Sequence, residues 1–515
     1  MIASETLPPE FNVATYFVDR NVTEGRGARP AFFHGDRVLT YADVQELANR
    51  AGNALADLGV VPEDRVWMCC LDAPEFLGAF WGAIKLGAIP IPANTLMRTA
   101  DYVYFLRDSR AKAAVVSAAL LPEVGPALSQ SPYLRHVLIA DGPAGAHLSW
   151  ESQLAKASAR LDAAVTSRDD AAFWLYSSGS TGFPKGAVHL HHDMVVCQES
   201  YARQVLGLRD TDRVYSAAKL FFAYGLGNAG YFPMGVGGQS VLYPGRPTPD
   251  AVFEIITRHR PTIFFGIPTL YAAMLNAKDL ERHDLSSLRL CVSAGEALPD
   301  ELYKRWRDRF GVEILDGIGT TEILHIFLSN RPGAARPGST GQVVPGYEAM
   351  LVDDDGRPVP RGEIGNLRVK GDSTMAYYWN KHDKTKTTLY GPWIQTGDKY
   401  HQDEDGYFWY AGRDDDMLKV GGIWVSPIEV ENTLIRHPAV LETAVVGAED
   451  TDRLVKPKAY VVLKDAAAGG SGLADELKSF VKDKIAPYKY PRWIEFVTEL
   501  PKTSTGKIQR FKLRA

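Results

Sequence analysis

The chain has 515 residues, more than one hydrophobic core usually serves, so its length predicts two or three domains. Its composition, with 45% hydrophobic and 23% charged residues, is typical of a globular protein, and a net charge of −5 argues against a general nucleic-acid-binding protein. The first residues lack the basic and apolar regions of a secretory signal, and no apolar run is long enough to span a membrane, so we expect a cytoplasmic protein.

Helix-like and strand-like segments alternate along the first part of the chain. Thr40 and Asp43 form a capping box that predicts a helix over residues 41–58. A strand is predicted over residues 65–70, and the next helix begins near Pro74. Buried strands are then predicted at residues 262–266, 288–293 and 312–316. This alternation indicates an α/β fold of mostly parallel sheets covered by helices, with ligands at the carboxyl ends of the strands.

The pattern changes after about residue 340. Shorter strands are separated by turns such as Asp355-Gly356 and Asp405-Gly406, which predicts a more antiparallel, barrel-like subdomain. A polar segment at residues 412–416 then precedes a block with its own helices and strands. We therefore expect a large N-terminal domain over residues 1–413 and a small, mobile α+β domain over residues 414–515.

The segment YSSGSTGFPKG at residues 176–186 points most directly to a function. Glycines let backbone N–H groups approach an anion closely, hydroxyls add donors, and Lys185 adds a positive charge. No Gly-Lys-Ser/Thr tripeptide follows, so the segment is not a Walker loop. An ordinary flexible surface loop would not need the apolar strand that precedes it. The segment therefore predicts a site that holds the polyphosphate of a nucleotide.

Three other patterns are interpreted as structural. The GxGxxG match at residues 225–230 lacks the acidic residue about twenty positions later that a dinucleotide site needs, so these glycines are expected to shape a pocket wall. His189, His191 and His192 are too close together for a usual zinc site and fit a helix-entry turn better. No CxxC spacing occurs, so we expect buried free thiols at Cys69, Cys70, Cys197 and Cys291.

Three further segments gain significance from their occurrence beside the phosphate loop. Residues 316–322 form a glycine- and hydroxyl-rich turn ending in Glu322, which suits Mg²⁺ against phosphate oxygens, or else a helix dipole. Asp398 lies at a predicted turn and suits two ribose hydroxyls, although an ordinary Asx turn would look the same. Lys507 lies on a glycine turn near the C-terminus, where a solvated charge is the alternative.

The chain resembles the acyl-adenylate-forming superfamily over nearly its whole length. This superfamily comprises acyl-CoA synthetases, peptide-synthetase adenylation domains and firefly luciferase. Its motifs occur here in the expected order as YSSGSTGFPKG, DGIGTTE, TGD, GRDDDMLKVGG and PKTSTGKIQR. Within the superfamily, the chain looks like an aryl-CoA ligase of the benzoate type, because of its segments at residues 218–228, 293–298, 316–330 and 486–492.

The resemblance implies roles for individual residues. Thr321, Glu322 and Lys507 would be catalytic, with Glu322 on Mg²⁺ and Lys507 between the carboxylate and the α-phosphate. The ATP- and AMP-binding residues would be Ser177, Ser178, Gly179, Ser180, Thr181, Gly182, Lys185, Gly295, Glu296, Asp316, Gly317, Ile318, Gly319, Thr320, Asp398 and Arg413. The acyl pocket would be formed by Phe222, Ala223, Tyr224, Ala294, His325 and Ile326. Ile318 stands where many relatives have tyrosine, so adenine would pack against an aliphatic side chain.

The resemblance also implies a movement of the C-terminal domain between two half-reactions. Asp415 would be the hinge, and rotation would bring Lys419, Gly421 and Gly422 to the CoA tunnel in place of Lys507. The expected activity is that of an AMP-forming acid–thiol ligase. Benzoate or a substituted benzoate would attack ATP to give acyl-AMP and pyrophosphate, and CoA would then take the acyl group and release AMP.

Several alternatives stay open at this point. The enzyme could prefer 4-hydroxybenzoate or an aminobenzoate, or it could be a stand-alone adenylation enzyme that loads a carrier protein. A non-enzymatic nucleotide-binding module or an NAD oxidoreductase is a further alternative. The expected partners are an aryl carboxylate, ATP, Mg²⁺ and CoA, with no prosthetic group, nucleic acid or membrane. A homodimer, and a lysine acetyltransferase acting on Lys507, are also expected.

Overall fold

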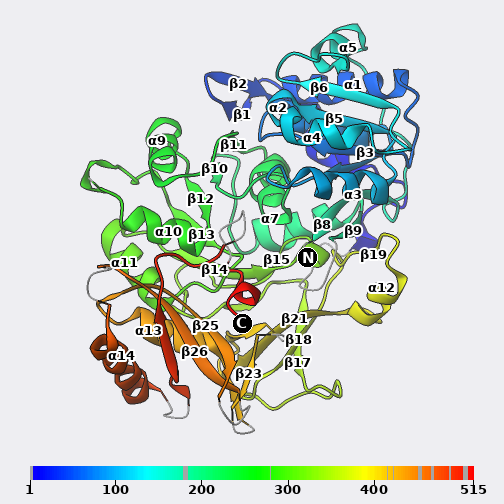
Figure 1. The fold of residues 1–515 in the computed structure, drawn as a ribbon. Helices are drawn as coiled ribbons and strands as arrows, with labels where there is room; N and C mark the ends of the chain where they lie inside the picture. The colour runs from blue at the N-terminus through cyan, green and yellow to red at the C-terminus, as the bar shows by residue number, and fades with distance from the viewer. Residues whose placement is uncertain are drawn as a thin grey trace.

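The computed structural model has the expected α/β architecture (Figure 1). Helices cover sheets throughout the N-terminal part, and a smaller α+β unit follows. In the part of the chain that is described, no helix is long and apolar enough to cross a membrane. The described residues are 4–177, 184–278, 280–413, 416–420, 423–450, 455–465, 469–485, 489–502 and 508–514.

A nine-stranded sheet forms the centre of the N-terminal part, in the order β16-β15-β14-β13-β12-β10-β11-β1-β2. From β1 to β14 along this order, neighbouring strands run parallel, so their carboxyl ends share one edge. The three buried strands predicted from the sequence are β12, β13 and β14. The strands of this sheet are β1 (Pro30–His34), β2 (Arg37–Thr40), β10 (Arg213–Ser216), β11 (Gln239–Leu242), β12 (Ile263–Gly266), β13 (Leu290–Ser293), β14 (Ile314–Gly319), β15 (Ile326–Ser329) and β16 (Gln342–Val343).

A second parallel sheet has the order β4-β3-β5-β6-β7. The strand predicted over residues 65–70 is β3, and the cysteines at its end are buried free thiols, as expected. The strands are β3 (Arg65–Cys69), β4 (Ile89–Pro92), β5 (Ala113–Ser117), β6 (His136–Ala140) and β7 (Leu148–Ser149). The helices of the N-terminal part are α1 (Tyr41–Asp57), α2 (Pro74–Lys85), α3 (Thr99–Ser109), α4 (Leu121–Leu128), α5 (Trp150–Lys156), α6 (Asp193–Cys197), α7 (Ala223–Gly225), α8 (Phe232–Val236), α9 (Pro249–His259), α10 (Pro268–Leu275), α11 (Asp300–Phe310) and α12 (His382–Thr388).

Helices α1 and α2 begin as the sequence predicts and pack very closely. The Thr40 side chain accepts a hydrogen bond from the Asp43 N–H, and the Asp43 carboxylate accepts one from the Thr40 N–H at 2.8 Å. A Cβ atom added to Gly82 would lie only 2.7 Å from the Ala51 Cβ and 2.8 Å from the Ala48 carbonyl oxygen. Glycine at position 82 therefore sets the distance between the two helices.

The predicted phosphate loop connects two antiparallel strands. Strand β8 (Ala171–Ser177) pairs with β9 (Lys185–Leu190), and Ser177 lies opposite Lys185. Strand β19 (Tyr377–Tyr378) continues this sheet on the other side of β9. The two ends of the loop are therefore held side by side by the hairpin.

A five-stranded antiparallel sheet follows, consistent with the change expected after residue 340. The turn expected at Asp398 is wrong, because Asp398 lies within a long strand whose backbone is locally irregular. Gly397 has φ of +79°, a conformation that favours glycine, and the pairing with the neighbouring strand shifts register here. The strands are β17 (Glu348–Val352), β18 (Gly365–Lys370), β20 (Leu389–Tyr390), β21 (Trp393–Gln402) and β22 (Phe408–Arg413).

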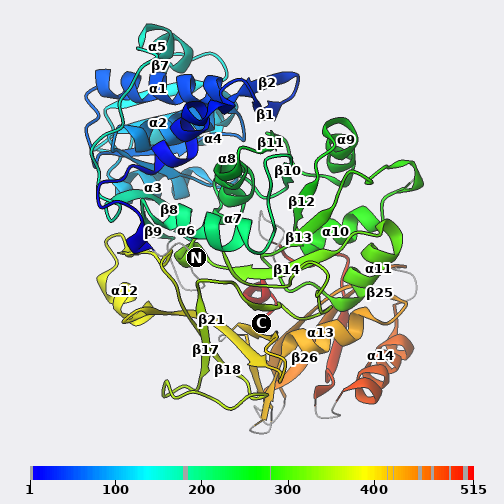
Figure 2. The ribbon, with the colours of Figure 1, turned by 180° about the vertical axis from the view of Figure 1, so that it is seen from behind.

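The C-terminal unit has its own core, which includes Val425, Val430, Leu434, Val461 and Leu477. Figures 1 and 2 show its helix α13 beside α11, and the Arg436 guanidinium donates to the Asp300 carboxylate at 3.0 Å. The proposed boundary at residues 413/414 stays a prediction. The elements are β23 (Leu418–Val420), β24 (Ile423–Val425), α13 (Pro427–Ile435), β25 (Val440–Glu449), β26 (Val455–Leu463), α14 (Ser471–Lys484) and β27 (Trp493–Phe496).

The helix contact generates a test of packing. Gly82→Ala should lower stability by about 1–3 kcal/mol, because the added methyl must push α1 and α2 apart. Gly125→Ala in α4 is the matched control, since a Cβ there meets nothing within 4 Å. Thermal unfolding followed by circular dichroism should show a lowered midpoint only for Gly82→Ala. Equal midpoints for the two variants would contradict the close-packing interpretation.

Candidate active site

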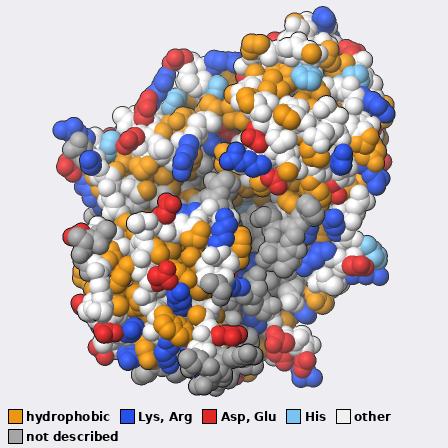
Figure 3. Space-filling view, viewed as in Figure 1, with side chains coloured by type: hydrophobic (Ala, Val, Ile, Leu, Met, Phe, Trp, Pro, Cys, Tyr) orange, Lys and Arg blue, Asp and Glu red, His pale blue; other side chains and the backbone are white. Residues whose placement is uncertain are grey.

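Two of the predicted nucleotide-binding segments, residues 295–296 and 316–320, lie at the carboxyl ends of the paired strands β13 and β14. Ser293 pairs with Asp316 at this edge, and the β8–β9 hairpin packs against the turn that follows β14. Figure 3 shows this face of the molecule hollowed across its middle, with Lys and Arg side chains on both sides of the hollow. The parallel topology therefore brings the separate sequence motifs to one place, as expected for an α/β sheet.

Glu322 is the central carboxylate of the site. It lies on a short 3₁₀ turn, Thr321–Ile323, and its Oε1 accepts hydrogen bonds from Ser177 Oγ at 2.9 Å and from the Tyr378 hydroxyl at 2.7 Å. Lys185 Nζ lies 4.8 Å from the centroid of the Tyr378 ring. Burial lowers the pKa of Lys185, and the Glu322 charge opposes that shift. The stem of the phosphate loop and the glutamate are thus already in contact.

Glu322 also meets the chemical requirements of a magnesium ligand. Among the residues that the structure describes, no group of three His, Cys, Asp or Glu side chains could hold a metal ion. Mg²⁺ bound with nucleotides usually has one or two protein carboxylates, and substrate phosphates and water complete its shell. One carboxylate surrounded by hydroxyls and facing a predicted phosphate site therefore fits Mg²⁺ and does not fit a structural zinc site.

Asp316 is a buried carboxylate in β14, where the pairing of this strand with β13 ends. Burial raises its pKa well above the usual range, while the backbone N–H groups of Leu298 and Gly317 oppose the shift. Its Oδ1 atom is buried and has no hydrogen-bond partner within the described ranges. Gly295 lies in the turn after β13, the strand that pairs with β14, and its φ of +93° favours glycine. A ligand with an N–H group could therefore satisfy this oxygen.

Asp398 and Arg413 face each other on β21 and β22. They are register partners, and the guanidinium donates to Asp398 Oδ1 at 3.0 Å. Asp398 is only 4% exposed, whereas the Arg413 side chain is 44% exposed. The arginine therefore orients a buried carboxylate from the solvent side, as the predicted ribose site requires.

His325 is the polar centre of the predicted acyl pocket. Its ring is surrounded by the rings of Tyr201, Tyr224 and Phe232, with centroid distances of 5.3, 5.8 and 4.5 Å. His325 Nε2 lies 3.2 Å from Asn228 Oδ1, so this nitrogen is the donor. Burial lowers the pKa of His325 to about 3, which keeps the ring neutral at neutral pH. Ile326, the next residue, and Ala294 are buried, and Phe222, Ala223 and Tyr224 are half-buried.

The GxGxxG segment shapes this pocket, as predicted. A Cβ on Gly227 would lie 2.4 Å from His325 Cδ2, and one on Gly225 would lie 2.1 Å from the Lys219 carbonyl oxygen. Side chains at these positions would displace the histidine or the preceding loop. The glycines therefore serve close packing around His325.

Asp72 and Lys219 hold the loop that leads into the predicted acyl pocket, and the sequence analysis did not identify them as site residues. Asp72 Oδ1 accepts the Leu220 N–H at 3.1 Å, and its Oδ2 lies 3.8 Å from Lys219 Nζ. Lys219 also donates to the carbonyl oxygens of Tyr243 and Gly245. These contacts fix the loop before Phe222. Tyr378 was missed for a similar reason, because only the pairing of β19 with β9 brings it to Glu322.

The remaining predicted residues are placed as follows. His191 and His192 lie in the turn before α6, as predicted, whereas His189 lies in β9. Gly319 is exposed, and Ile318, Thr320, Thr321 and Glu296 are half-buried. Several predictions fall outside the described residues, namely Ser178, Gly179, Ser180, Thr181, Gly182, Asp415, Gly421, Gly422, Lys507 and the side chain of Lys419.

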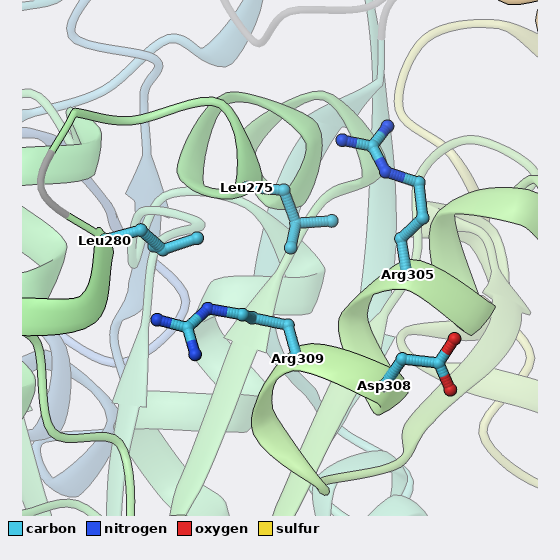
Figure 4. A pocket seen from close by; sticks show the side chains of 5 residues that line it. All are labelled: Leu275, Leu280, Arg305, Asp308 and Arg309. Carbon is cyan, nitrogen blue, oxygen red and sulfur yellow. The ribbon is translucent and has the colours of Figure 1, made fainter.

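A second hollow of about 420 Å³ lies between α10 and α11 (Figure 4). Its lining residues are Leu275, Leu280, Arg305, Asp308 and Arg309. The two guanidinium groups point in different directions, so they do not form one anion site. None of the predicted site residues lines this hollow, and we assign it no part in the chemistry.

Comparison with known proteins shows the family of the chain. The family described as AMP-binding enzyme matches residues 18–379, and the AMP-binding enzyme C-terminal domain matches residues 429–507. The chain belongs to the AMP-binding enzyme family. The first match contains YSSGSTGFPKG and DGIGTTE, the second ends within PKTSTGKIQR, and TGD and GRDDDMLKVGG lie between the two matches.

Similar proteins extend over almost the whole of this AMP-binding enzyme. A benzoate–CoA ligase of Thauera aromatica is 52% identical over 99% of this chain and 97% of its own length. A 4-hydroxybenzoate–CoA/benzoate–CoA ligase of Rhodopseudomonas palustris is 48% identical over 98% of this chain and 94% of its own length. The crystal structure of an anthranilate–CoA ligase with anthranoyl-AMP superposes with a TM-score of 0.96, 47% identity and coverage of 99% and 98%. The crystal structure of a benzoate–CoA ligase from Burkholderia xenovorans superposes with a TM-score of 0.91 and 48% identity, and the match covers 98% of this chain and 100% of that one.

The Asp72–Lys219 pair predicts a pH effect on the stability of this AMP-binding enzyme. Burial raises the pKa of Asp72 from 3.8 to about 6, despite the nearby lysine. Because the pKa of Asp72 is higher in the folded state than in the unfolded state, protonated Asp72 stabilises the fold. This stabilisation is full below pH 3.8 and disappears as the pH rises through about 6.

Asp72→Asn keeps an acceptor for the Leu220 N–H but removes the titration. Between pH 5 and pH 8 the wild type should therefore lose about 1 kcal/mol of stability relative to the variant. Urea unfolding of both proteins at several pH values measures this difference. A constant difference across that range would show that Asp72 does not titrate there.

Proposed function

We propose that this protein is an AMP-forming aryl-CoA ligase that converts benzoate, or a ring-substituted benzoate, to its CoA thioester. The observation that carries the proposal is the near-full-length identity of 52% and 48% with two benzoate–CoA ligases. The geometry supports it, because Ser177 at the end of β8 donates to Glu322, a carboxylate suited to Mg²⁺, and His325, three residues later in the chain, lies among aromatic rings.

The chemistry needs placement and charge neutralisation more than a protein nucleophile. A carboxylate oxygen attacks the α-phosphorus of ATP in line, the bond to pyrophosphate breaks, and acyl-AMP forms. The thiolate of CoA then attacks the acyl carbon, and AMP leaves. Holding the reactants in position and stabilising the charge that develops on phosphorus can supply most of the acceleration.

The described residues suit these steps. Glu322 would hold Mg²⁺, which neutralises phosphate charge when it is bound, and Lys185 would add a positive charge at the phosphates. Asp398, oriented by Arg413, would accept the ribose hydroxyls. Asp316 would meet the adenine side of the nucleotide through its unpartnered oxygen. Thr321, next to Glu322, would face the reacting phosphorus.

The acid would enter the pocket around His325. Because aromatic rings surround a neutral imidazole, the site presents flat apolar walls with a few polar atoms, which suits a benzene ring. The Tyr224 hydroxyl and the imidazole offer contacts for a ring hydroxyl or amino group. Phe232, whose ring centroid is 4.5 Å from that of His325, and Ile326 are both buried, and we expect them to exclude a long alkyl chain from the pocket.

A panel of acids tests this proposal. Benzoate, hydroxybenzoates, aminobenzoates and short fatty acids are assayed for AMP formation with and without CoA. We expect CoA-dependent AMP release with benzoate or a substituted benzoate, and kcat/KM values at least about 100-fold lower for the fatty acids, because they leave the ring slot unfilled. AMP release that requires a carrier protein would support the carrier-loading alternative. Absence of pyrophosphate release with every aryl acid would refute ligase activity.

We further propose that Lys507 serves only the first half-reaction, with Asp415 as the hinge and residues 419–422 replacing it in the second. The separate core of the C-terminal unit supports such a rotation. Neutralising the Lys507 charge by acetylation should then stop adenylation. A homodimer also stays a proposal.

Lys507→Ala separates the two half-reactions. Formation of acyl-AMP from ATP should fall by at least about 100-fold, since a charge at the α-phosphate is lost, while thioester formation from supplied acyl-AMP should fall less than about 3-fold. Lys502→Ala is the control, because it removes a lysine of the same motif whose ammonium group already donates to Glu442. Pyrophosphate release and thioester formation are measured separately. Equal loss in both half-reactions would contradict the proposed rotation.

A further inference from the structure

We propose that His189 is a positioning residue, which holds the turn carrying Thr321 and Glu322 against the strand that leaves the phosphate loop. This inference rests on the function proposed above. The zinc interpretation of the histidine cluster is excluded by its spacing, and His189 is not part of the turn that holds His191 and His192. Its role is therefore to be found in its own contacts.

The His189 ring connects two elements that are far apart in sequence. It lies on β9, four residues after Lys185, and is fully buried. Its Nδ1 is 2.7 Å from Asp193 Oδ2, and its Nε2 is 2.7 Å from the Thr321 carbonyl oxygen. The ring is thus a bridge between the start of α6 and the turn that carries the proposed magnesium ligand.

The chemistry of the partners fixes what the ring must do. A backbone carbonyl can only accept, so His189 Nε2 must carry a proton and donate it to Thr321. Asp193 Oδ2 also accepts the Leu190 N–H at 3.1 Å, which holds the carboxylate in place at Nδ1. The Phe173 ring stacks on the imidazole with centroids 5.3 Å apart. Asp193, Thr321 and Phe173 therefore hold the imidazole ring in one orientation, with Nε2 directed at the Thr321 carbonyl.

The turn needs such support because its backbone is strained. Leu324, which follows it, has φ of +70° and ψ of −41°, a costly conformation for a residue with a Cβ atom. Each carbonyl of the turn is held from outside. His189 donates to Thr321, the Met375 N–H to Glu322 at 2.7 Å, and Ser373 Oγ to Ile323 at 2.8 Å.

His189 is the member of this set that lies on the strand leaving the phosphate loop. Met375 and Ser373 both belong to one segment before β19, whereas His189 lies on β9. The donated hydrogen bond therefore ties the backbone of the turn to β9, whereas Ser177 and Tyr378 hold the Glu322 side chain, and together these bonds position Glu322 relative to Lys185. The alternative is that His189 is an ordinary core histidine, whose two hydrogen bonds stabilise the fold and do not position Glu322.

Two variants of His189 distinguish these interpretations. The amide nitrogen of glutamine can occupy the place of Nε2, so His189→Gln keeps a donor for Thr321. Asparagine is shorter and can reach only Asp193, so His189→Asn loses the bridge. We expect acyl-AMP formation to fall about 10-fold or more for His189→Asn and less than about 3-fold for His189→Gln, which is the scale of one buried hydrogen bond.

Two further readouts do not depend on turnover by the whole reaction. Thioester formation from supplied acyl-AMP should change less than about 3-fold in both variants, because it does not use the magnesium site. The dissociation constant of Mg²⁺ with α,β-methylene-ATP, measured by calorimetry, should rise about 10-fold for His189→Asn only. Equal behaviour of the two variants, or equal loss in both half-reactions, would overturn the proposal.

A measurement on the wild type covers the case in which His189→Asn does not fold. A ¹H–¹⁵N spectrum of the histidine rings should show a slowly exchanging proton on His189 Nε2, because the donor is buried and bonded. Its absence would overturn the proposal without any variant. A wild type that makes no acyl-AMP would refute the proposed function instead, and the calorimetric comparison would still decide the role of His189.

Discussion

The hydrogen bond between Ser177 and Glu322 joins two parts of the chain that are 145 residues apart, and the candidate site depends on it. Ser177 ends the strand that enters the phosphate loop, and Glu322 lies on the turn after β14. Their contact fixes the β8–β9 hairpin over the carboxyl edge of the central sheet.

Burial governs the electrostatics of the site. It raises the pKa of Asp72 and Asp316 and lowers the pKa of His325 and Lys185. In each case desolvation disfavours the charged form, and neighbouring groups compensate only in part. A site built this way gives strong interactions with a charged ligand, because little water competes for its polar groups. Burial also holds supporting residues such as Asp72 in one position, although they are not proposed to contact a substrate.

Much of the architecture could be read from local pattern. The capping box at Thr40 starts α1, and the apolar segments that were predicted as strands are β3, β12, β13 and β14. The glycines at 225 and 227 were correctly separated from a dinucleotide site. Asp398 was misplaced on a turn, because a Thr-Gly-Asp sequence looks the same whether the chain reverses or, as here, continues through an irregular strand.

The sequence by itself predicted the chemistry of the candidate site, because phosphate binding, magnesium binding and ribose binding need particular residue types at close spacing along the chain. The tertiary structure alone decided which other residues support them. Tyr378 reaches Glu322 through the pairing of β19 with β9, and His189 reaches Thr321 across two elements. Such contacts depend on strand order and register, which no short segment of sequence contains.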